Sequence, residues 1–182
     1  MDIEINNKFI EYTYHRRPHR IDGPAREYFN GTKLWFFNGI QHREDGPAEE
    51  RPNDFDWRLN RLYHRTDGPA RKWADDRKEW WVNGERHRPD GPAVEYKNGS
   101  YEWYLNDLLH RDDGPSRHLV PILVTEFKNV PGFEEWHQYG KLHRENGPAV
   151  IYFNGKGNHV QYWFCGLQYE YADYCKLLKL EV

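Results

Sequence analysis

Hydrophobic residues along this chain occur in short runs that alternate with polar residues, and Asn-Gly pairs separate the runs. The segment Lys33–Phe37 is one example, with Asn30-Gly31 before it and Asn38-Gly39 after it. Asn and Gly both tolerate the positive φ that the central residues of a type I′ turn require. Two alternating runs joined by such a pair predict a β-hairpin, and successive residues of each strand point to opposite faces.

The hairpin pattern is part of a longer repeat. The segment His87–Ala93, which reads His-Arg-Pro-Asp-Gly-Pro-Ala, occurs in six related copies, and the others begin at His19, His42, His64, His110 and His143. The six starts are 23, 22, 23, 23 and 33 residues apart. Seven positions before each His there is an aromatic residue: Tyr12, Trp35, Trp57, Trp80, Trp103 and Trp136. A fixed period of this length indicates stacked supersecondary units.

We therefore predict an all-β fold: an elongated, solenoid-like antiparallel sheet of about six to seven hairpin repeats of about 23 residues. A single repeat domain is expected over residues 1–182, with a degenerate first unit at 1–18 and hairpin repeats at 19–166. Apolar residues at positions 171, 174, 177 and 178 have helical spacing and predict a short helical cap within 167–182.

The period of two also predicts two unlike sheet faces. Trp35 and Phe37 share one face, which is apolar in every repeat and is expected to form the stacked core. The residue between them points the other way and varies widely in chemistry. We expect this second face to be an exposed, partner-binding surface, and its candidate residues are Phe36, Arg58, Trp81, Tyr104, His137 and Trp163.

An insertion near 117–130 separates the last two copies of the repeat. It contains the most apolar run of the chain, Leu119–Val124. One interpretation is an extra strand or a loop that packs on the sheet. The other is a partner-binding loop, because insertions in repeat proteins gather on one functional face.

Composition narrows the class of protein. Charged residues make up 30% and the mean hydropathy is −1.08, but aromatic residues reach 16%, which suits a thin sheet and argues against disorder. The net charge of −3 gives no overall attraction to nucleic acid or to an anionic membrane. Two cysteines make no disulfide framework, and neither a signal peptide nor a long apolar run is present. We therefore expect a soluble, cytoplasmic protein.

The His-Arg pair and the Asp-Gly-Pro turn of the repeat allow two interpretations. Asp-Gly-Pro is typical of a turn, and Arg pairing with the Asp of its own or the adjacent turn gives a structural ladder, with His donating to a carbonyl or stacking on Trp. Alternatively, the Arg forks form an anion-binding row for a nucleotide or nucleic acid, composed of Arg20, Arg43, Arg65, Arg88, Arg111 and Arg144. No metal site, cofactor or catalytic residue is expected, because no zinc spacing, nucleophile motif or Cys beside a suitable His is found.

The frame Trp-x-x-Asn-Gly-x-x-His-Arg-x-Asp-Gly-Pro-Ala, with a second Asn-Gly one strand later, resembles MORN repeats over about residues 9–170. The matching positions include Trp80, Gly84 and His87. It looks closest to the variant in bacterial antitoxin-like proteins and in bacteriophage and large-virus proteins. This resemblance implies a twisted sheet of hairpins, a binding role and no catalytic residues.

The expected function is therefore non-catalytic binding of a protein partner, as a phage or bacterial inhibitor or antitoxin-like factor in the cytoplasm, which is the host cytoplasm if the protein is viral. The alternatives are anionic-ligand binding by the Arg row and a structural or scaffold role.

Overall fold

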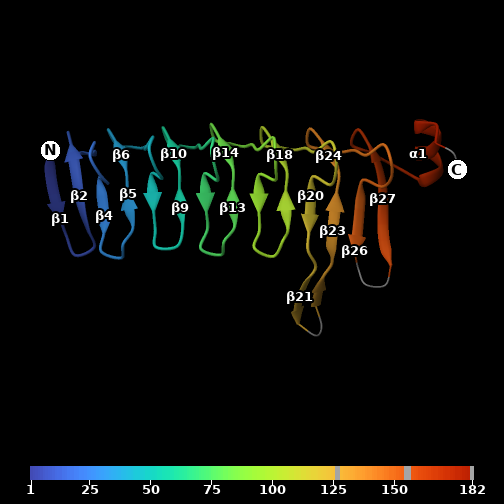
Figure 1. Cartoon of the computed structure of the whole chain (residues 1–182), viewed down its shortest axis with the longest axis horizontal. Helices are drawn as coiled ribbons and strands as arrows, with labels where there is room; N and C mark the ends of the chain where they lie inside the picture. The colour runs from blue at the N-terminus through green and yellow to red at the C-terminus, as the bar shows by residue number, and fades with distance from the viewer. Residues whose placement is uncertain (126–127, 154–156, 181–182) are drawn as a thin grey trace. The chain divides into compact units, whose positions relative to one another are not determined.

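Short antiparallel strands joined by tight turns form almost the whole chain, as Figure 1 shows. The structure is a computed structural model that describes residues 1–125, 128–153 and 157–180. The chain divides into two compact units, residues 1–85 and 86–182. Each unit is an open antiparallel sheet of hairpin repeats, which confirms the predicted all-β fold.

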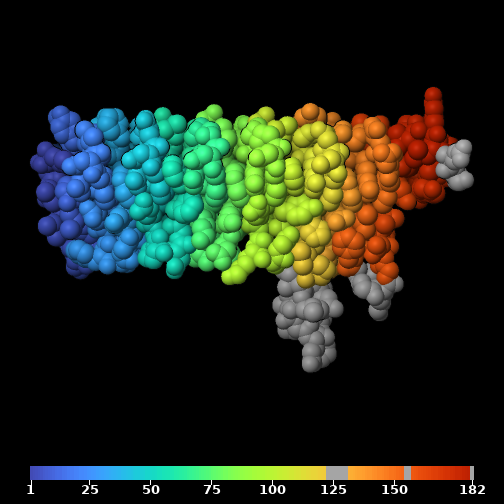
Figure 2. Space-filling model, in the orientation of Figure 1, coloured from blue at the N-terminus to red at the C-terminus, as the bar shows by residue number. Residues whose placement is uncertain are grey.

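In the first unit the sheet order follows the chain from the edge inward. Its strands, in spatial order, are β1 (Asp2–Ile5), β2 (Phe9–Tyr14), β4 (Arg26–Tyr28), β5 (Lys33–Leu34), β8 (Glu49–Glu50), β9 (Phe55–Asp56), β12 (Arg71–Lys72) and β13 (Lys78–Glu79). The short strand β3 (Arg17–Pro18) pairs with β2. Within this unit, successive colours form neighbouring bands in Figure 2, as expected where each repeat packs on its neighbours in sequence.

The second unit has the same order of pairing. Its sheet runs through β16 (Val94–Glu95), β17 (Tyr101–Glu102), β20 (Arg117–Leu119), β23 (Gly132–Glu135), β26 (Val150–Phe153), β27 (Asn158–Phe164) and β28 (Leu167–Tyr169). The insertion forms an extra hairpin of β21 (Ile122–Thr125) and β22 (Lys128–Val130), which confirms an extra strand. The loop between these two strands, and so part of the predicted binding loop, lies outside the described residues.

A second set of hairpins continues from the sheet strands, one after each aromatic residue of the repeat. Their strands are β6 (Phe36–Phe37) with β7 (Ile40–Gln41), β10 (Arg58–Leu59) with β11 (Leu62–Tyr63), β18 (Tyr104–Leu105) with β19 (Leu108–Leu109), and β24 (His137–Gln138) with β25 (Lys141–Leu142). Two further strands, β14 (Trp81–Val82) and β15 (Glu85–Arg86), lie on either side of the Asn83-Gly84 turn.

The two Asn-Gly pairs of a repeat form different turns. Asn38 and Gly39 both have positive φ, 51° and 78°, as a type I′ turn requires. At the earlier pair only Gly31 does, with φ of 89°, and the Gly31 amide donates to the Tyr28 carbonyl at 3.0 Å. The earlier pair is therefore a longer loop with one left-handed glycine, and the expectation of a type I′ turn there is wrong.

The fully buried centre of each repeat is a small residue. These positions have 0% exposure and are Ala25, Ala48, Ala70, Ala93, Ser116 and Ala149. Their carbonyls accept the amide of an aromatic residue, as Ala70 does from Trp57 at 2.7 Å. The expectation of a uniform apolar core on the Trp face is wrong, since Trp35 is only half-buried and Phe37 is exposed.

The C-terminal helix α1 (Tyr171–Leu178) packs against the last strands of the second unit, as the predicted cap requires. Tyr174 is 1% exposed, and its ring lies 5.1 Å from that of Tyr162 on β27. Its hydroxyl donates to the Arg144 carbonyl at 2.5 Å and accepts the Gly147 amide at 3.2 Å. The helix thus binds the last of the repeated turns through one buried tyrosine.

Candidate functional site

The repeated turns form one face of each sheet, here called the turn face, on which an arginine lies over the aromatic residue of its repeat. The guanidinium carbon lies 3.9–4.4 Å from the ring centroid in the pairs Arg20 with Tyr12, Arg43 with Trp35, Arg65 with Trp57, Arg111 with Trp103, and Arg144 with Trp136. Cation–π contact of this kind favours a fixed guanidinium. The aromatic row is thus covered by arginine instead of by a second apolar layer.

The same guanidinium is hydrogen-bonded within its own turn. In the second copy, Arg43 Nε donates to Asp45 at 2.9 Å, and Arg43 NH1 donates to the Pro47 carbonyl at 3.2 Å and to Glu50 at 3.0 Å. The hydrogen bond from Arg43 lowers the pKa of the Asp45 carboxyl. The ladder interpretation, in which Arg pairs with the Asp of its own turn, is confirmed.

The glycine of each turn provides the space for this packing. A Cβ added to Gly46 would lie 2.4 Å from Arg43 Cζ, and one added to Gly68 would lie 2.8 Å from Arg65 Cζ. A side chain at either position would displace the guanidinium. Gly in Asp-Gly-Pro is therefore required by the arginine as well as by the turn.

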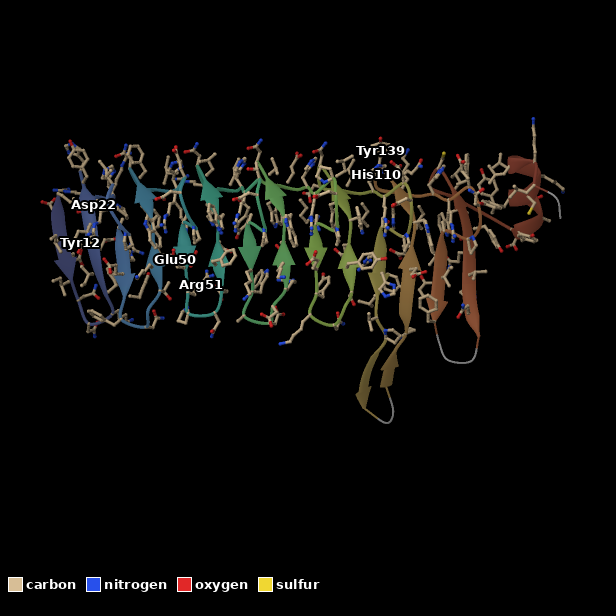
Figure 3. All side chains as sticks on the ribbon, viewed as in Figure 1. Tyr12, Asp22, Glu50, Arg51, His110 and Tyr139 are labelled. Atoms are coloured by element: carbon tan, nitrogen blue, oxygen red, sulfur yellow. The ribbon has the colours of Figure 1, made fainter. Side chains whose placement is uncertain are left out.

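The histidines connect each turn to the hairpin of the next repeat. His19 Nδ1 accepts the Asn38 amide at 3.0 Å, and His42 Nδ1 accepts the Asn60 amide at 3.1 Å. Nδ1 of these rings acts as an acceptor, and the expected donation from His to a carbonyl is not observed within the described residues. At His110 the stacking ring is that of Tyr139, not of a Trp, and the two residues lie side by side in Figure 3; their ring centroids are 4.3 Å apart.

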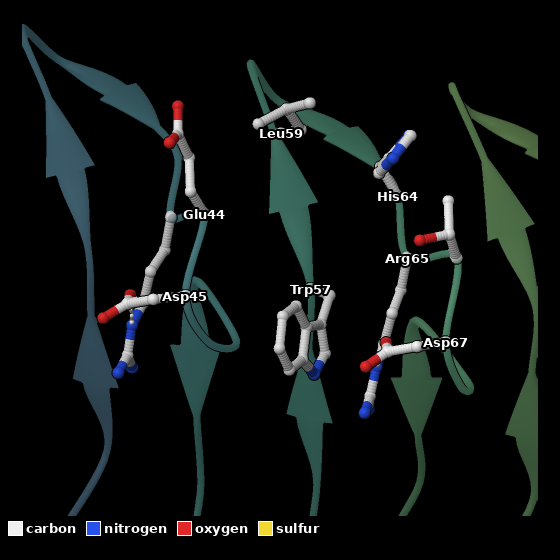
Figure 4. Close-up of a pocket in the computed structure, with 9 residues that line it drawn as sticks. Glu44, Asp45, Trp57, Leu59, His64, Arg65 and Asp67 are labelled. Carbon is white, nitrogen blue, oxygen red and sulfur yellow. Dashed lines mark hydrogen bonds and ion pairs between the residues drawn. The ribbon is translucent and has the colours of Figure 1, made fainter.

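Recesses recur between consecutive turns. One of about 540 Å³ is lined by the turns at 43–45 and 64–67, with Trp57 and Leu59 between them, as Figure 4 shows. In the second unit, similar recesses of about 460 Å³ and 270 Å³ are lined by Trp103 and by Trp136. Each recess therefore presents an aromatic ring between two polar turns.

The rims of these recesses are acidic. Glu44 and Asp112 are at least 80% exposed, and each lies 3.6 Å from Nε2 of the His two residues earlier in the chain. Asp45, Asp67 and Asp113 are exposed as well, each already bonded to its arginine. The turn face therefore presents carboxylates to solvent, while its guanidinium groups are held inside.

The opposite face carries the six predicted partner-binding residues. Phe36, Arg58, Trp81 and Trp163 are half-buried, whereas Tyr104 and His137 are only 9% and 7% exposed. The expectation of an exposed row is wrong for the last two. Tyr104 donates to Glu102 at 2.9 Å, and Trp81 Nε1 donates to Glu79 at 3.0 Å. In four of the six repeats the residue two positions earlier in the strand is charged: Asp56, Glu79, Glu102 and Glu135.

Those charged residues form a cross-strand ladder that the sequence reasoning missed. In the first unit Arg71 Nε donates to Asp56 at 3.0 Å and its NH1 lies 3.6 Å from Glu79; Asp56 is 3% exposed. In the second unit Arg117 lies between Glu102 at 3.1 Å and Glu135 at 3.6 Å. Aligning the repeats on their alanines would have placed these residues in one register, since Arg26, Glu49, Arg71 and Arg117 each follow the small residue.

Among the six predicted partner-binding residues, His137 lies beside the small buried residue of a repeat, which is Ser116 here and Ala in the other repeats. Ser116 replaces Ala, and its hydroxyl donates to the Glu135 carbonyl at 3.1 Å and lies 2.9 Å from His137 Nδ1. Burial, together with the charge of Arg117, lowers the pKa of His137 to about 4. His137 is therefore neutral at pH 7. Because the Ser116 hydroxyl proton goes to the Glu135 carbonyl, the Ser116 oxygen accepts the Nδ1 proton of His137.

One cysteine lies beside a histidine, contrary to the sequence-based expectation. Cys165 Sγ is 3.6 Å from His143 Nδ1. The same Nδ1 accepts the amide of Cys165 at 3.1 Å, so its lone pair is already engaged. The pair repeats the His-to-hairpin bond of the other copies, with Cys in the position of Asn.

No model of a known protein family matches this sequence, and comparison with curated proteins likewise finds no match. Within the described residues, no three His, Cys, Asp or Glu side chains group as metal ligands. No helix in the described part of the chain is long and apolar enough to cross a membrane.

Proposed function

We propose that this chain is a non-catalytic binding module that holds a protein partner on its turn face. The observation that carries the proposal is the repetition of one recess, an aromatic ring between two polar turns, three times along the two units. Aromatic rings bordered by charged rims are typical anchor points of protein interfaces. A partner segment lying along the turns would meet the same chemistry at each step.

A protein suits this face better than a nucleic acid does. The rims carry exposed carboxylates such as Glu44 and Asp112, which repel phosphates. Of the six arginines in the predicted anion-binding row, five pair with an Asp of their own turn. Their forks are therefore engaged already, and binding phosphate would require breaking those pairs.

The proposal includes the absence of turnover. The polar groups on the turn face recur from repeat to repeat and are hydrogen-bonded within their turns, whereas a catalytic site needs one singular, poised constellation. We propose further that the chain is a MORN-like phage or bacterial inhibitor that acts in the cytoplasm of a bacterial cell. The repeat frame supports the likeness, and the free thiols of Cys165 and Cys175 suit a reducing compartment.

Affinity capture from bacterial lysate with matched variants tests the binding face. Glu44→Arg with Asp112→Arg reverses two exposed rim charges, and Arg58→Ala with Trp81→Ala alters the opposite face. Circular dichroism should first show that both variants keep the β spectrum. We expect the rim variant to lose a partner that the second variant retains. Loss by the second variant alone would place the partner on the opposite face and contradict the proposal.

A further inference from the structure

The sixth turn lacks the carboxylate that neutralises arginine in the other five. Asn146 stands where the other turns have Asp, and Ile151 stands where Glu27, Glu50 and Glu95 bind arginine. Arg144 NH1 donates to the Pro148 carbonyl at 3.0 Å, and the described residues include no carboxylate that pairs with Arg144. Its Nε therefore keeps an unused donor, whereas Nε of Arg43 donates to Asp45.

The sixth turn also leaves more space between its glycine and its guanidinium. A Cβ added to Gly147 would lie 3.5 Å from Arg144 Cζ, against 2.4 Å for Gly46 and Arg43. Burial lowers the pKa of Arg144, and the opposing effects of the Tyr174 and Glu134 charges do not outweigh it. An unpaired, partly buried guanidinium stacked 3.9 Å from Trp136 is poised to accept an anionic partner.

A second, independent feature of the same recess is a buried donor without an acceptor. His143 is 8% exposed, and its Nδ1 accepts the Cys165 amide, so the ring proton lies on Nε2. This buried Nε2 has no hydrogen-bond partner within the described part of the chain, and Glu145 Oε1 lies 3.9 Å away, beyond bonding distance. An unsatisfied buried donor is destabilising, and a bound acceptor would give it a hydrogen-bond partner.

Arg144 and His143 both line the recess of about 270 Å³ beside Trp136. The Gln138 and Asn146 amides also line it, and both can donate. Asp112 and Glu145 are exposed at its rim, at 80% and 66%. The recess thus has hydrogen-bond donors for one anion at its buried end and exposed carboxylates at its entrance.

We propose that this recess binds a carboxylate carried by the protein partner, held by Arg144 and His143, with a basic residue beside it meeting the acidic rim. The inference rests on the proposed function and names the group that the partner presents. A carboxylate suits the site better than a phosphate, because the rim carboxylates repel a dianion more strongly than a monoanion. A planar carboxylate also matches the guanidinium fork and the ring beneath it.

Two pairs of short peptides distinguish a chain terminus from an acidic side chain. Acetyl-Gly-Lys-Gly ends in a free carboxylate and is compared with its amide. Acetyl-Gly-Lys-Glu-Gly-amide has an internal Glu and is compared with the Gln peptide. Binding to the intact chain is followed by NMR shifts of arginine Nε–H groups and histidine rings. At least one acidic peptide should bind saturably and shift Arg144 and His143, and its neutral counterpart should bind at least tenfold more weakly.

The decisive variant is Asn146→Asp, which gives Arg144 the carboxylate that the other turns have. It should keep or raise the melting temperature and weaken peptide binding at least tenfold. Binding unchanged by Asn146→Asp, inorganic phosphate binding more tightly than either peptide, or no binding by either acidic peptide would each overturn the proposal.

The first unit offers a matched gain of function. Asp67→Asn should remove the carboxylate that pairs with Arg65. Lys72 occupies the position at which Glu50 pairs with Arg43, so it offers no replacement carboxylate. The recess beside Trp57 should then bind the same peptide. Absence of new shifts at Arg65 in that variant would also contradict the proposal. A partner captured equally by wild type and Asn146→Asp, but lost by the rim variant, would leave the proposed function standing and remove only this inference.

Discussion

Ala70 shows how little space each repeat leaves at its centre. It is 0% exposed, and its carbonyl accepts the Trp57 amide at 2.7 Å. Ala70→Leu should therefore destabilise the fold by about 1–3 kcal/mol, because extra methylenes in a filled position force the neighbours apart. Ala74→Leu, at an exposed position in the same repeat, is the control for chemical denaturation. Equal effects at the two positions would show that the alanine column is not tightly packed.

His137 should make stability depend on pH in the mildly acidic range. Its pKa is about 4 in the folded chain because of burial and of Arg117, and about 6.5 is usual when unfolded. Between these values the unfolded chain binds the extra proton, so stability falls as pH falls, by at most about 1.4 kcal/mol for each pH unit. The contribution is complete above pH 6.5.

The measurement is a series of denaturant titrations from pH 7 to pH 4. His137→Gln should flatten this part of the profile, whereas His159→Gln, at an exposed position, should leave it unchanged. A wild-type profile already flat between pH 6.5 and pH 4 would show that His137 is not a neutral buried group.

Some contacts of individual side chains could be predicted from the sequence, and others could not. The pairing of Arg43 with Asp45 was predictable, because both lie in one short turn. The bond between His42 Nδ1 and the Asn60 amide was not, because it joins residues 18 positions apart and depends on the ring's orientation. Periodicity likewise assigned Tyr104 to the correct face but not its burial, which depends on Glu102 and Arg86 around it.

Among the elements, α1 contacts the sixth turn through the hydroxyl of Tyr174. Tyr174 bonds the Arg144 carbonyl and the Gly147 amide from a position that is 1% exposed. Tyr174→Phe should destabilise the second unit by about 1–3 kcal/mol, since the buried carbonyl and amide lose their partner. Tyr171→Phe, at a half-exposed position of the same helix, is the control in thermal unfolding. A larger loss from Tyr171→Phe would contradict this account of the cap.

The hairpins and the cap could be predicted because their signals are local. Asn38-Gly39 specifies a tight turn, and the apolar spacing at 171–178 specifies a helix. The earlier Asn30-Gly31 pair misled the prediction because the same dipeptide also fits a longer loop with one left-handed glycine. The recesses could not be read from any single repeat, because each lies between two turns.

For the whole molecule, the repeat period was sufficient to predict the hairpin architecture, but the expectation of an apolar core on the Trp face was wrong. The sequence allowed two interpretations of the arginine row, and the pairing of Arg65 with Asp67 agrees with the ladder. Apolar periodicity marked the Trp face as the core, but Arg65 covers the Trp57 ring. The reason is physical: a one-layer sheet has no second apolar layer, so long polar side chains cover its rings. In the sixth turn Asn146 stands in place of Asp, and Arg144 pairs with no carboxylate in the described part of the chain.

Acid should unfold the molecule through its turns. The hydrogen bond from arginine lowers the pKa of Asp22, Asp45, Asp67 and Asp113. A lowered carboxyl pKa contributes stability that is complete above the unfolded value of about 3.9 and is lost as pH falls through the folded value. Over the same range the 26 Lys and Arg residues and the protonated His residues repel one another with few ionised carboxylates to offset them.

Melting curves from pH 5 to pH 2 test this directly. Changing the four aspartates to Asn should lower stability at pH 7 and flatten its dependence on pH below 4, because the paired carboxylates are gone. Glu44→Gln with Asp112→Asn removes neighbouring carboxylates that face His instead of Arg, and this control should keep the wild-type slope. If the control flattened the profile as much as the four-Asn variant, general charge repulsion, and not the turn pairs, would account for the acid unfolding.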